Sequence, residues 1–76
     1  MTENERVREL RKTLGLTLEK FGERLGVKKN AISAIENGRN SLTDQMTKAI
    51  CREFGVDYIW LTTGEGEMFV DTDDDF

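Results

Sequence analysis

The sequence predicts a compact, all-α domain of five short helices, and three observations support this. Apolar residues recur at intervals of three and four, the period of an amphipathic helix. No segment alternates apolar and polar residues over a useful length except 65–70, where we expect at most a short strand. Each apolar stretch is followed by a glycine that can end a helix in the left-handed conformation, namely Gly15, Gly26, Gly38, Gly55 and Gly64.

The first helix is expected over 4–14, where Thr2 and Glu5 have the spacing of a capping box. Its inward face consists of Val7, Leu10 and Leu14. The second helix begins after Thr17, a good N-cap residue, and ends at Leu25.

The third helix is expected over 29–37 and the fourth after Thr43. The inward residues of the fourth helix are Met46, Ala49, Ile50 and Phe54. The fifth helix is short, about 57–63, with Asp57 as its cap and Gly64 as its stop.

Composition excludes several classes of protein. The chain of 76 residues has no histidine and one cysteine, so the usual catalytic base, zinc ligands and internal disulfides are missing. We therefore expect neither an enzyme nor a metal, cofactor or small-molecule site. The first twenty residues are charged and contain no apolar run, so no signal peptide or membrane span is predicted, and we expect a cytoplasmic protein.

Charge is distributed unevenly along the chain. Residues 1–64 carry a net charge of +2, whereas 65–76 carry −6 and no base. Between Arg24 and Arg39 the basic residues outnumber the single acid, Glu36, so the local field is positive. We accordingly divide the chain into a helical domain, 1–64, and an acidic tail, 65–76, whose last residues (DTDDDF) are expected to be disordered rather than a metal site.

Gly22 lies inside the second helix, where glycine costs about 1 kcal/mol relative to alanine. The two helices on either side of Gly26 can cross nearly at right angles if Gly26 takes a positive φ and the residue below the crossing is small. A glycine at position 22 meets the second condition. The absent side chain therefore predicts a tight helix-turn-helix.

This pattern resembles the helix-turn-helix of the phage-repressor class, the Cro/repressor or xenobiotic-response-element family. The likeness is carried by LTLEKFGERLGVKKNAISAIENGR (16–39) and by DYIWLTTGEGEMF (57–69), which looks like sequences of phage and prophage repressors. The resemblance implies a lambda-repressor-like fold, a bacterial or phage-encoded chain and double-stranded DNA as the partner. The alternative is a helical bundle that merely contains a tight turn.

At 100° per residue, the third helix turns Ala31, Ile32 and Ile35 toward the core. The opposite, polar strip suits the major groove, and its candidate base-reading residues are Lys29, Asn30, Ser33 and Ala34. An ordinary solvated helix face is the alternative. Lys28 and Lys29 place two cations at the positive end of the helix dipole, a local conflict that favours a functional role.

Phosphate contacts are expected on both sides of this strip. The start of the second helix, Thr17 and Leu18, offers backbone N–H groups, and Lys28 can reach a phosphate with its long stem. The resemblance implies a second clamp in the loop after the third helix, at Asn37, Arg39 and Asn40. Where the family commonly has a bracing glutamine, this chain has Leu18, so that brace is in doubt.

The resemblance also implies a partly buried ion pair between Arg11 and Glu36; two solvated charges are the alternative. Cys51 is expected to be a small, half-buried hydrophobe rather than a redox sensor.

The fifth helix is apolar in nearly every direction, with Trp60 and Leu61 at core positions. Apolar residues beyond what a small core can bury suggest a two-fold dimer contact, with candidates Tyr58, Ile59, Met68 and Phe69. The alternative is that Met68 and Phe69 fold back on their own core.

The leading hypothesis is a sequence-specific DNA-binding transcriptional regulator, a repressor that binds a palindromic operator as a homodimer through helix 29–37. The alternative is an antitoxin or regulatory adaptor that uses the same module to bind a protein partner.

Overall fold

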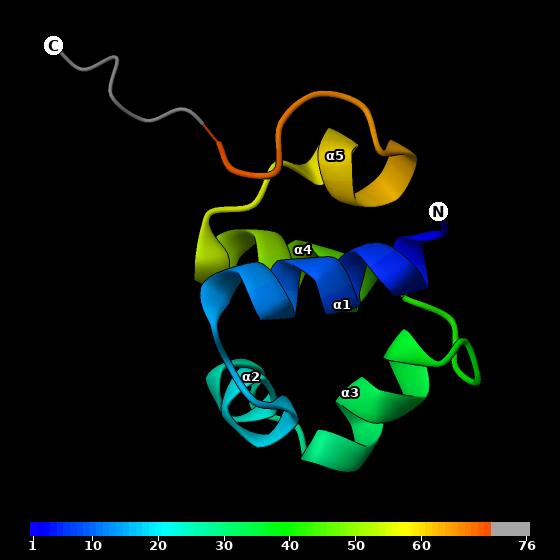
Figure 1. The fold of residues 1–76 in the computed structure, drawn as a ribbon, viewed down its shortest axis with the longest axis vertical. Helices are drawn as coiled ribbons and strands as arrows, with labels where there is room; N and C mark the ends of the chain where they lie inside the picture. The colour runs from blue at the N-terminus through cyan, green and yellow to red at the C-terminus, as the bar shows by residue number, and fades with distance from the viewer. Residues whose placement is uncertain (71–76) are drawn as a thin grey trace, which may run out of the picture.

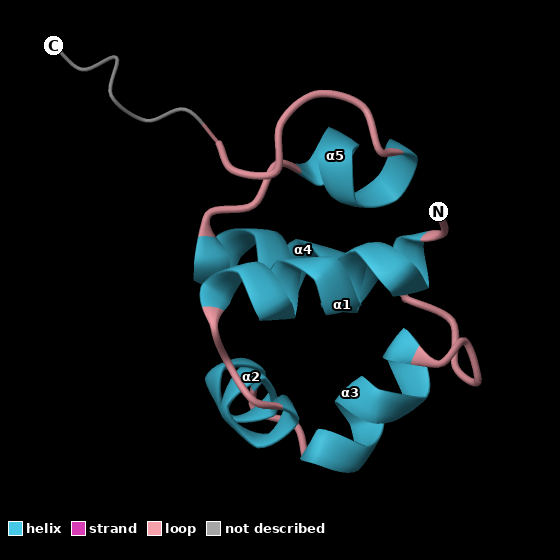
Figure 2. Ribbon diagram, viewed as in Figure 1, coloured by secondary structure: helices cyan, strands magenta, loops and turns pink. Residues whose placement is uncertain are grey.

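The structure, a computed structural model, describes residues 1–70. It forms five α-helices: α1 (Glu3–Leu14), α2 (Leu18–Leu25), α3 (Lys29–Glu36), α4 (Asp44–Phe54) and α5 (Tyr58–Thr63). Figure 1 shows α2 and α3 together at one end, α1 and α4 across the middle and α5 at the other end; Figure 2 shows the same arrangement by secondary structure. The predicted all-α, five-helix fold is confirmed. No helix within 1–70 is long and apolar enough to cross a membrane.

Side-chain caps begin four of the five helices, since Thr2, Thr17, Thr43 and Asp57 each accept a hydrogen bond from a backbone N–H of the first turn. The capping box between Thr2 and Glu5 has both of its hydrogen bonds. The helix ends differ slightly from expectation. α1 begins one residue earlier than predicted, at Glu3, and α5 begins at Tyr58 because Asp57 serves as its cap.

α3 also ends one residue earlier than predicted, at Glu36. The backbone of Asn37 is still in the right-handed helical region, and its N–H donates to the carbonyl of Ser33 at 3.0 Å. The chain leaves the helix at Gly38, where φ is +80°. Gly38 donates its N–H to the carbonyl of Ile35 at 3.1 Å, a shorter-range bond that closes the helix.

The core lies between the helices and draws residues from all of them. The predicted inward residues that are buried are Val7, Leu10, Ile32, Ile35 and Ile50. Those that are half-buried are Leu14, Ala31, Met46, Ala49 and Phe54. Phe21 of α2 is fully buried and stacks on Phe54 of α4, with ring centroids 4.9 Å apart. The buried apolar residues are Val7, Leu10, Phe21, Ile32, Ile35, Leu42, Ile50, Val56, Trp60 and Leu61.

A buried arginine fastens α5 to α1. Arg6 is 6% exposed and donates from Nε to the carbonyl of Leu61 at 2.7 Å and from Nη2 to that of Thr62 at 3.1 Å. These carbonyls belong to the last turn of α5, which has no intrahelical donors for them. The cation at this negative helix end therefore holds α5 in place.

The segment after α5 returns to the start of that helix. Val56 and Phe69 form an isolated antiparallel bridge. Two backbone hydrogen bonds of 2.9 Å flank it: the N–H of Asp57 donates to the carbonyl of Met68, and the N–H of Val70 donates to the carbonyl of Gly55. The strand expected over 65–70 is thus reduced to one bridge within the described residues. The expected disorder of DTDDDF lies outside them.

Candidate nucleic-acid interface

The crossing of α2 and α3 depends on Gly22. A Cβ atom built there would lie 2.6 Å from the carbonyl oxygen of Val27 and 3.4 Å from Cγ1 of Ile32. Gly26 provides the turn with φ at +79°. Both predicted conditions are met, with one refinement: the closest atom is a carbonyl of the turn, and the next helix contributes the side chain of Ile32 beside it.

This crossing leaves one side of α3 facing outward. Ile32 and Ile35 are buried, whereas Lys29 and Asn30 are exposed and Ser33 and Ala34 are half-buried. A surface hollow of about 390 Å³ is lined by Asn30, Ser33, Ala34, Arg39 and Asn40. The structure therefore brings three of the four candidate base-reading residues together with two candidates of the loop clamp.

Lys29 lies on the neighbouring hollow, which sequence reasoning did not anticipate. That hollow, also about 390 Å³, lies between α2 and the start of α3 and is lined by Glu19, Glu23, Val27, Lys28, Lys29 and Asn30. Lys28 is the N-cap residue of α3, and its side chain makes no capping hydrogen bond. However, the two cations share their hollow with two carboxylates, which offset part of the dipole conflict. The sequence feature that could have indicated this is the pair of acids at positions i and i+4 of α2, Glu19 and Glu23.

The start of α2 offers the backbone donors that the phosphate hypothesis requires. The hydroxyl of Thr17 accepts the N–H of Lys20 at 3.1 Å, while the N–H groups of Leu18 and Glu19 belong to the first turn, which has no intrahelical acceptors. The Leu18 side chain packs against the core. Leu18 can therefore contribute its N–H group, but its side chain does not replace the glutamine brace.

The loop after α3 is compact. The N–H groups of Arg39 and Asn40 both donate to the carbonyl of Ala34, at 2.9 and 3.2 Å, and the amide of Asn37 donates to Oγ of Ser33 at 3.3 Å. The side chains of Asn37, Arg39 and Asn40 are exposed. The loop clamp candidates therefore lie beside the outward strip of α3.

The predicted ion pair between Arg11 and Glu36 forms with two-pronged geometry. Nε and Nη2 of Arg11 donate to the two carboxylate oxygens at 2.7 and 3.2 Å, and Nη1 donates to the carbonyl of Leu16 at 3.0 Å. The two side chains are 15% and 6% exposed. The pair therefore joins α1, the link to α2 and the end of α3.

Arg24 contributes less to the positive field than its charge suggests. Its Nε donates to Glu53 of α4 at 2.7 Å, and its guanidinium lies 5.1 Å from the centre of the Phe54 ring. Arg24 thus joins α2 to α4. The positive charge near α3 comes instead from Lys28, Lys29 and Arg39.

Asn4 is a further residue that sequence reasoning missed. Its side-chain Nδ2 donates to the carbonyl of Ile35 at 2.7 Å and to that of Asn40 at 2.9 Å. The only signal was its position seven residues before Arg11, which places both on one face of α1.

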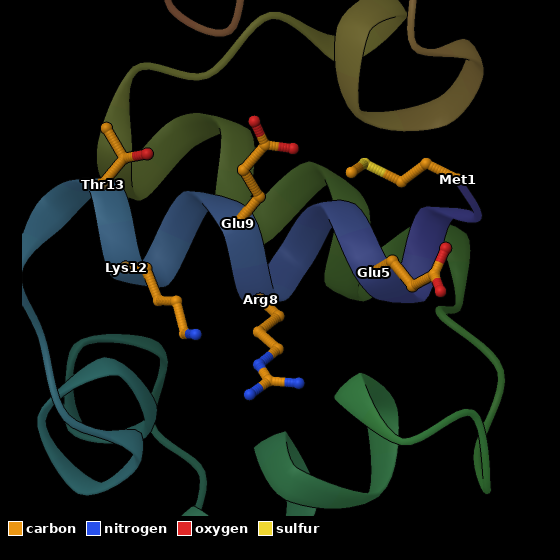
Figure 3. A pocket seen from close by; sticks show the side chains of 6 residues that line it. All are labelled: Met1, Glu5, Arg8, Glu9, Lys12 and Thr13. Carbon is orange, nitrogen blue, oxygen red and sulfur yellow. The ribbon is translucent and has the colours of Figure 1, made fainter.

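A larger surface hollow, about 810 Å³, lies elsewhere, over the outer face of α1. Figure 3 shows that Arg8 and Lys12 project downward from this helix, whereas Glu9 projects upward and Glu5 points sideways. Met1 and Thr13 complete the lining. A lining with exposed charges of both signs is typical of a solvated helix surface, so this hollow is not the candidate site.

Apolar side chains are exposed on α5 and on the segment after it. Figure 1 shows α5 at the opposite end of the fold from α3. Tyr58, Ile59, Phe69 and Val70 are 42%, 52%, 38% and 46% exposed. Met68 differs from the other dimer candidates, because it is half-buried against its own core. The fold-back alternative therefore applies to Met68, and the exposed group of four is called the α5 patch below.

Cys51 is half-buried on α4. Burial, with a smaller effect from the charge of Asp57, raises the pKa of its thiol.

Comparison with known proteins identifies the domain. A family model described as a helix-turn-helix domain matches residues 4–67. The P22 c2 repressor, in a crystal structure with synthetic operator 9T, superposes with a TM-score of 0.76 at 25% identity, covering 86% of this chain and 98% of that one.

Three relatives are also similar in sequence. A propionyl-CoA carboxylase regulator from Cereibacter sphaeroides is 42% identical over 86% of this chain, and antitoxin PezA from Streptococcus pneumoniae is 34% identical over 90%. This chain spans only 14% and 42% of those two proteins. An uncharacterized HTH-type transcriptional regulator from Methanothermobacter thermautotrophicus is 43% identical over 70% of this chain and 77% of its own length. The chain therefore belongs to the helix-turn-helix domain family and has the fold of the P22 c2 repressor.

Proposed function

We propose that this chain is a sequence-specific transcriptional regulator that reads the major groove of double-stranded DNA with α3. The observation that carries the proposal is the shared hollow of Asn30, Ser33 and Ala34 with Arg39 and Asn40. Base-reading and phosphate-binding groups must lie on one continuous surface, because bases and phosphates border the same groove. Family membership supports a regulator over an enzyme.

The side chains of α3 fit the edges of bases in the groove. Lys29 can donate to O6 and N7 of guanine, and the amide of Asn30 can pair with N6 and N7 of adenine. Ser33 lies one turn further along and can bond a base or a phosphate, while the methyl group of Ala34 suits the methyl group of thymine.

Phosphates on either side would fix the register. On one side the N–H groups of Leu18 and Glu19, next to Thr17, can bind a phosphate at the start of α2. On the other side the loop residues Asn37, Arg39 and Asn40 would do so, with Arg39 supplying the charge. Lys28 would add a phosphate contact through its flexible stem.

We further propose that the protein is a repressor that occupies a palindromic operator as a homodimer. The α5 patch supports this, because exposed apolar side chains on α5 and on the segment after it are candidates for a protein contact. A homodimer of a helix-turn-helix domain carries two recognition helices, which would match the two half-sites of a palindromic operator. The similar P22 c2 repressor binds an operator.

A second candidate function is that of an antitoxin or regulatory adaptor, in which the α5 patch binds another protein. The similarity to antitoxin PezA favours it. Ile59→Asp distinguishes the two functions. For a homodimer, the variant should sediment as a monomer and lose affinity for a palindrome while keeping its affinity for a half-site. An unchanged mass and unchanged palindrome affinity would instead favour the adaptor.

The proposed function is tested by selecting bound sequences from a random DNA pool and then comparing two variants. Lys29→Ala should lower the affinity for the selected duplex by about 1–3 kcal/mol and weaken binding to random DNA less, so that discrimination between the two falls. Arg39→Ala should weaken binding to both and reduce the salt slope by about one. If both changes affect all DNA equally, the assignment of roles is wrong.

A further inference from the structure

Asn4 joins α1 to the candidate phosphate loop. Its Nδ2 donates to the carbonyl of Ile35, in the last turn of α3, at 2.7 Å and to the carbonyl of Asn40, in the loop, at 2.9 Å. One amide group of α1 therefore contacts the chain both before and after α3 turns into the loop.

The other hydrogen bonds of this loop are local. Gly38 donates to Ile35, and Arg39 and Asn40 both donate to the carbonyl of Ala34. Asn37 reaches back only to Ser33. Among the hydrogen bonds of residues 1–70, the one from Asn4 is therefore the one that ties loop 37–40 to a different helix.

We propose that Asn4 is a positioning residue for DNA binding. It holds loop 37–40 against α1 and so directs Arg39 toward a phosphate, a role that rests on the proposed function. Its amide has two hydrogens and both are used, so Asn4 acts through the loop rather than by touching DNA.

The chemistry requires an amide at this position. A carboxylate has almost the same shape but only acceptor atoms, so Asn4→Asp would set a negative oxygen against two carbonyl oxygens. The same change lies in the first turn of α1, where a negative charge stabilises the helix. Asn4→Asp therefore separates the stability of α1 from the attachment of loop 37–40, because it stabilises the helix and removes the hydrogen bonds that hold the loop.

The test compares Asn4→Asp and Asn4→Ala with the control Gln45→Glu. Gln45 is the second residue of α4, as Asn4 is of α1, and its side chain is exposed, so the control makes the same amide-to-acid change without an anchor to lose. The probe is a duplex of random sequence at low salt, to which phosphate contacts dominate binding. Both Asn4 variants should bind about tenfold more weakly, the expected effect of losing two partly solvated hydrogen bonds. Gln45→Glu should change affinity less than twofold.

A double-mutant cycle with Arg39→Ala measures the coupling between Asn4 and Arg39 in DNA affinity. A general loss of stability at Asn4 would not produce such coupling. In the Arg39→Ala background, the Asn4 variants should weaken binding less than twofold. Amide hydrogen exchange of Arg39 and Asn40 should also be faster in the Asn4 variants while the core of α2 keeps its protection.

Fully additive effects of Asn4 and Arg39, or unchanged DNA affinity despite a loosened loop, would overturn the inference. If Asn4→Asp does not fold, Asn4→Ala carries the same test. A wild-type chain that binds no DNA would instead refute the proposed function, so the two failures are distinguishable.

Discussion

Gly22→Ala tests the packing on which the interface depends. The new Cβ would lie 2.6 Å from the carbonyl oxygen of Val27, whereas ordinary contacts begin near 3.4 Å. The turn must therefore move by most of an ångström. Because the opposing atom belongs to the backbone and not to a flexible side chain, we expect a cost near the upper end of the usual range for overpacking, about 3 kcal/mol.

Alanine also stabilises the helix relative to glycine by about 1 kcal/mol. The net expectation is a loss of about 2 kcal/mol in the free energy of unfolding, which for a domain of this size corresponds to roughly 10 °C in Tm. The assay is thermal and urea unfolding followed by circular dichroism. Gly22→Val should be worse, since it adds two more carbons at the same crossing.

Glu23→Ala is the matched control, because Glu23 is the next residue of α2 and its side chain is exposed. It offers alanine's helix preference without the clash, so Tm should change by no more than about 2–3 °C. A Gly22→Ala variant as stable as the wild type, with unchanged affinity for a selected operator, would refute the steric reasoning.

Two further predictions concern charges and the thiol. Arg11→Ala should destabilise the fold by about 3 kcal/mol, because it leaves the buried Glu36 carboxylate unpaired. Arg24→Ala removes an exposed ion pair and should cost only about 1 kcal/mol. Equal losses of stability in urea unfolding would contradict this contrast. The pKa of the Cys51 thiol is raised in the folded state, so the protonated thiol favours folding. This contribution to stability is fully present below the pKa of the unfolded state and is lost as pH rises through the pKa of the folded state. Alkylation by iodoacetamide near pH 8 should therefore be slower in the native protein than in urea, and equal rates would argue for a reactive thiol.

The sequence predicted the helices and the α2–α3 crossing because their causes are local. Capping residues, left-handed glycines and the period of apolar residues act within a few positions of the chain. Gly22 was informative because a glycine inside a helix needs a reason, and steric crowding supplied it. The pairing of Arg11 with Glu36 came from family resemblance, since the two residues lie 25 positions apart.

The contacts that were missed depend on how distant segments meet. The Asn4 amide bonds carbonyl groups 31 and 36 residues away, and a backbone carbonyl leaves no trace in the sequence. Arg24 was counted with the DNA-facing charges because its partner, Glu53, lies on a helix whose placement the sequence does not specify. Residues 68–70 were likewise difficult to place, because one backbone bridge produces no repeating pattern.

The most direct measurement of the DNA-facing surface is a titration of ¹⁵N-labelled protein with a selected duplex, followed by amide chemical shifts. We predict the largest changes at the start of α2, in residues 28–34 of α3 and its approach, and in loop 37–40. The outer face of α1 around Glu5 and Glu9 should change little. Largest changes on that face of α1, with α3 unaffected, would contradict the view that the helix crossing at Gly22 serves to present α3 to DNA.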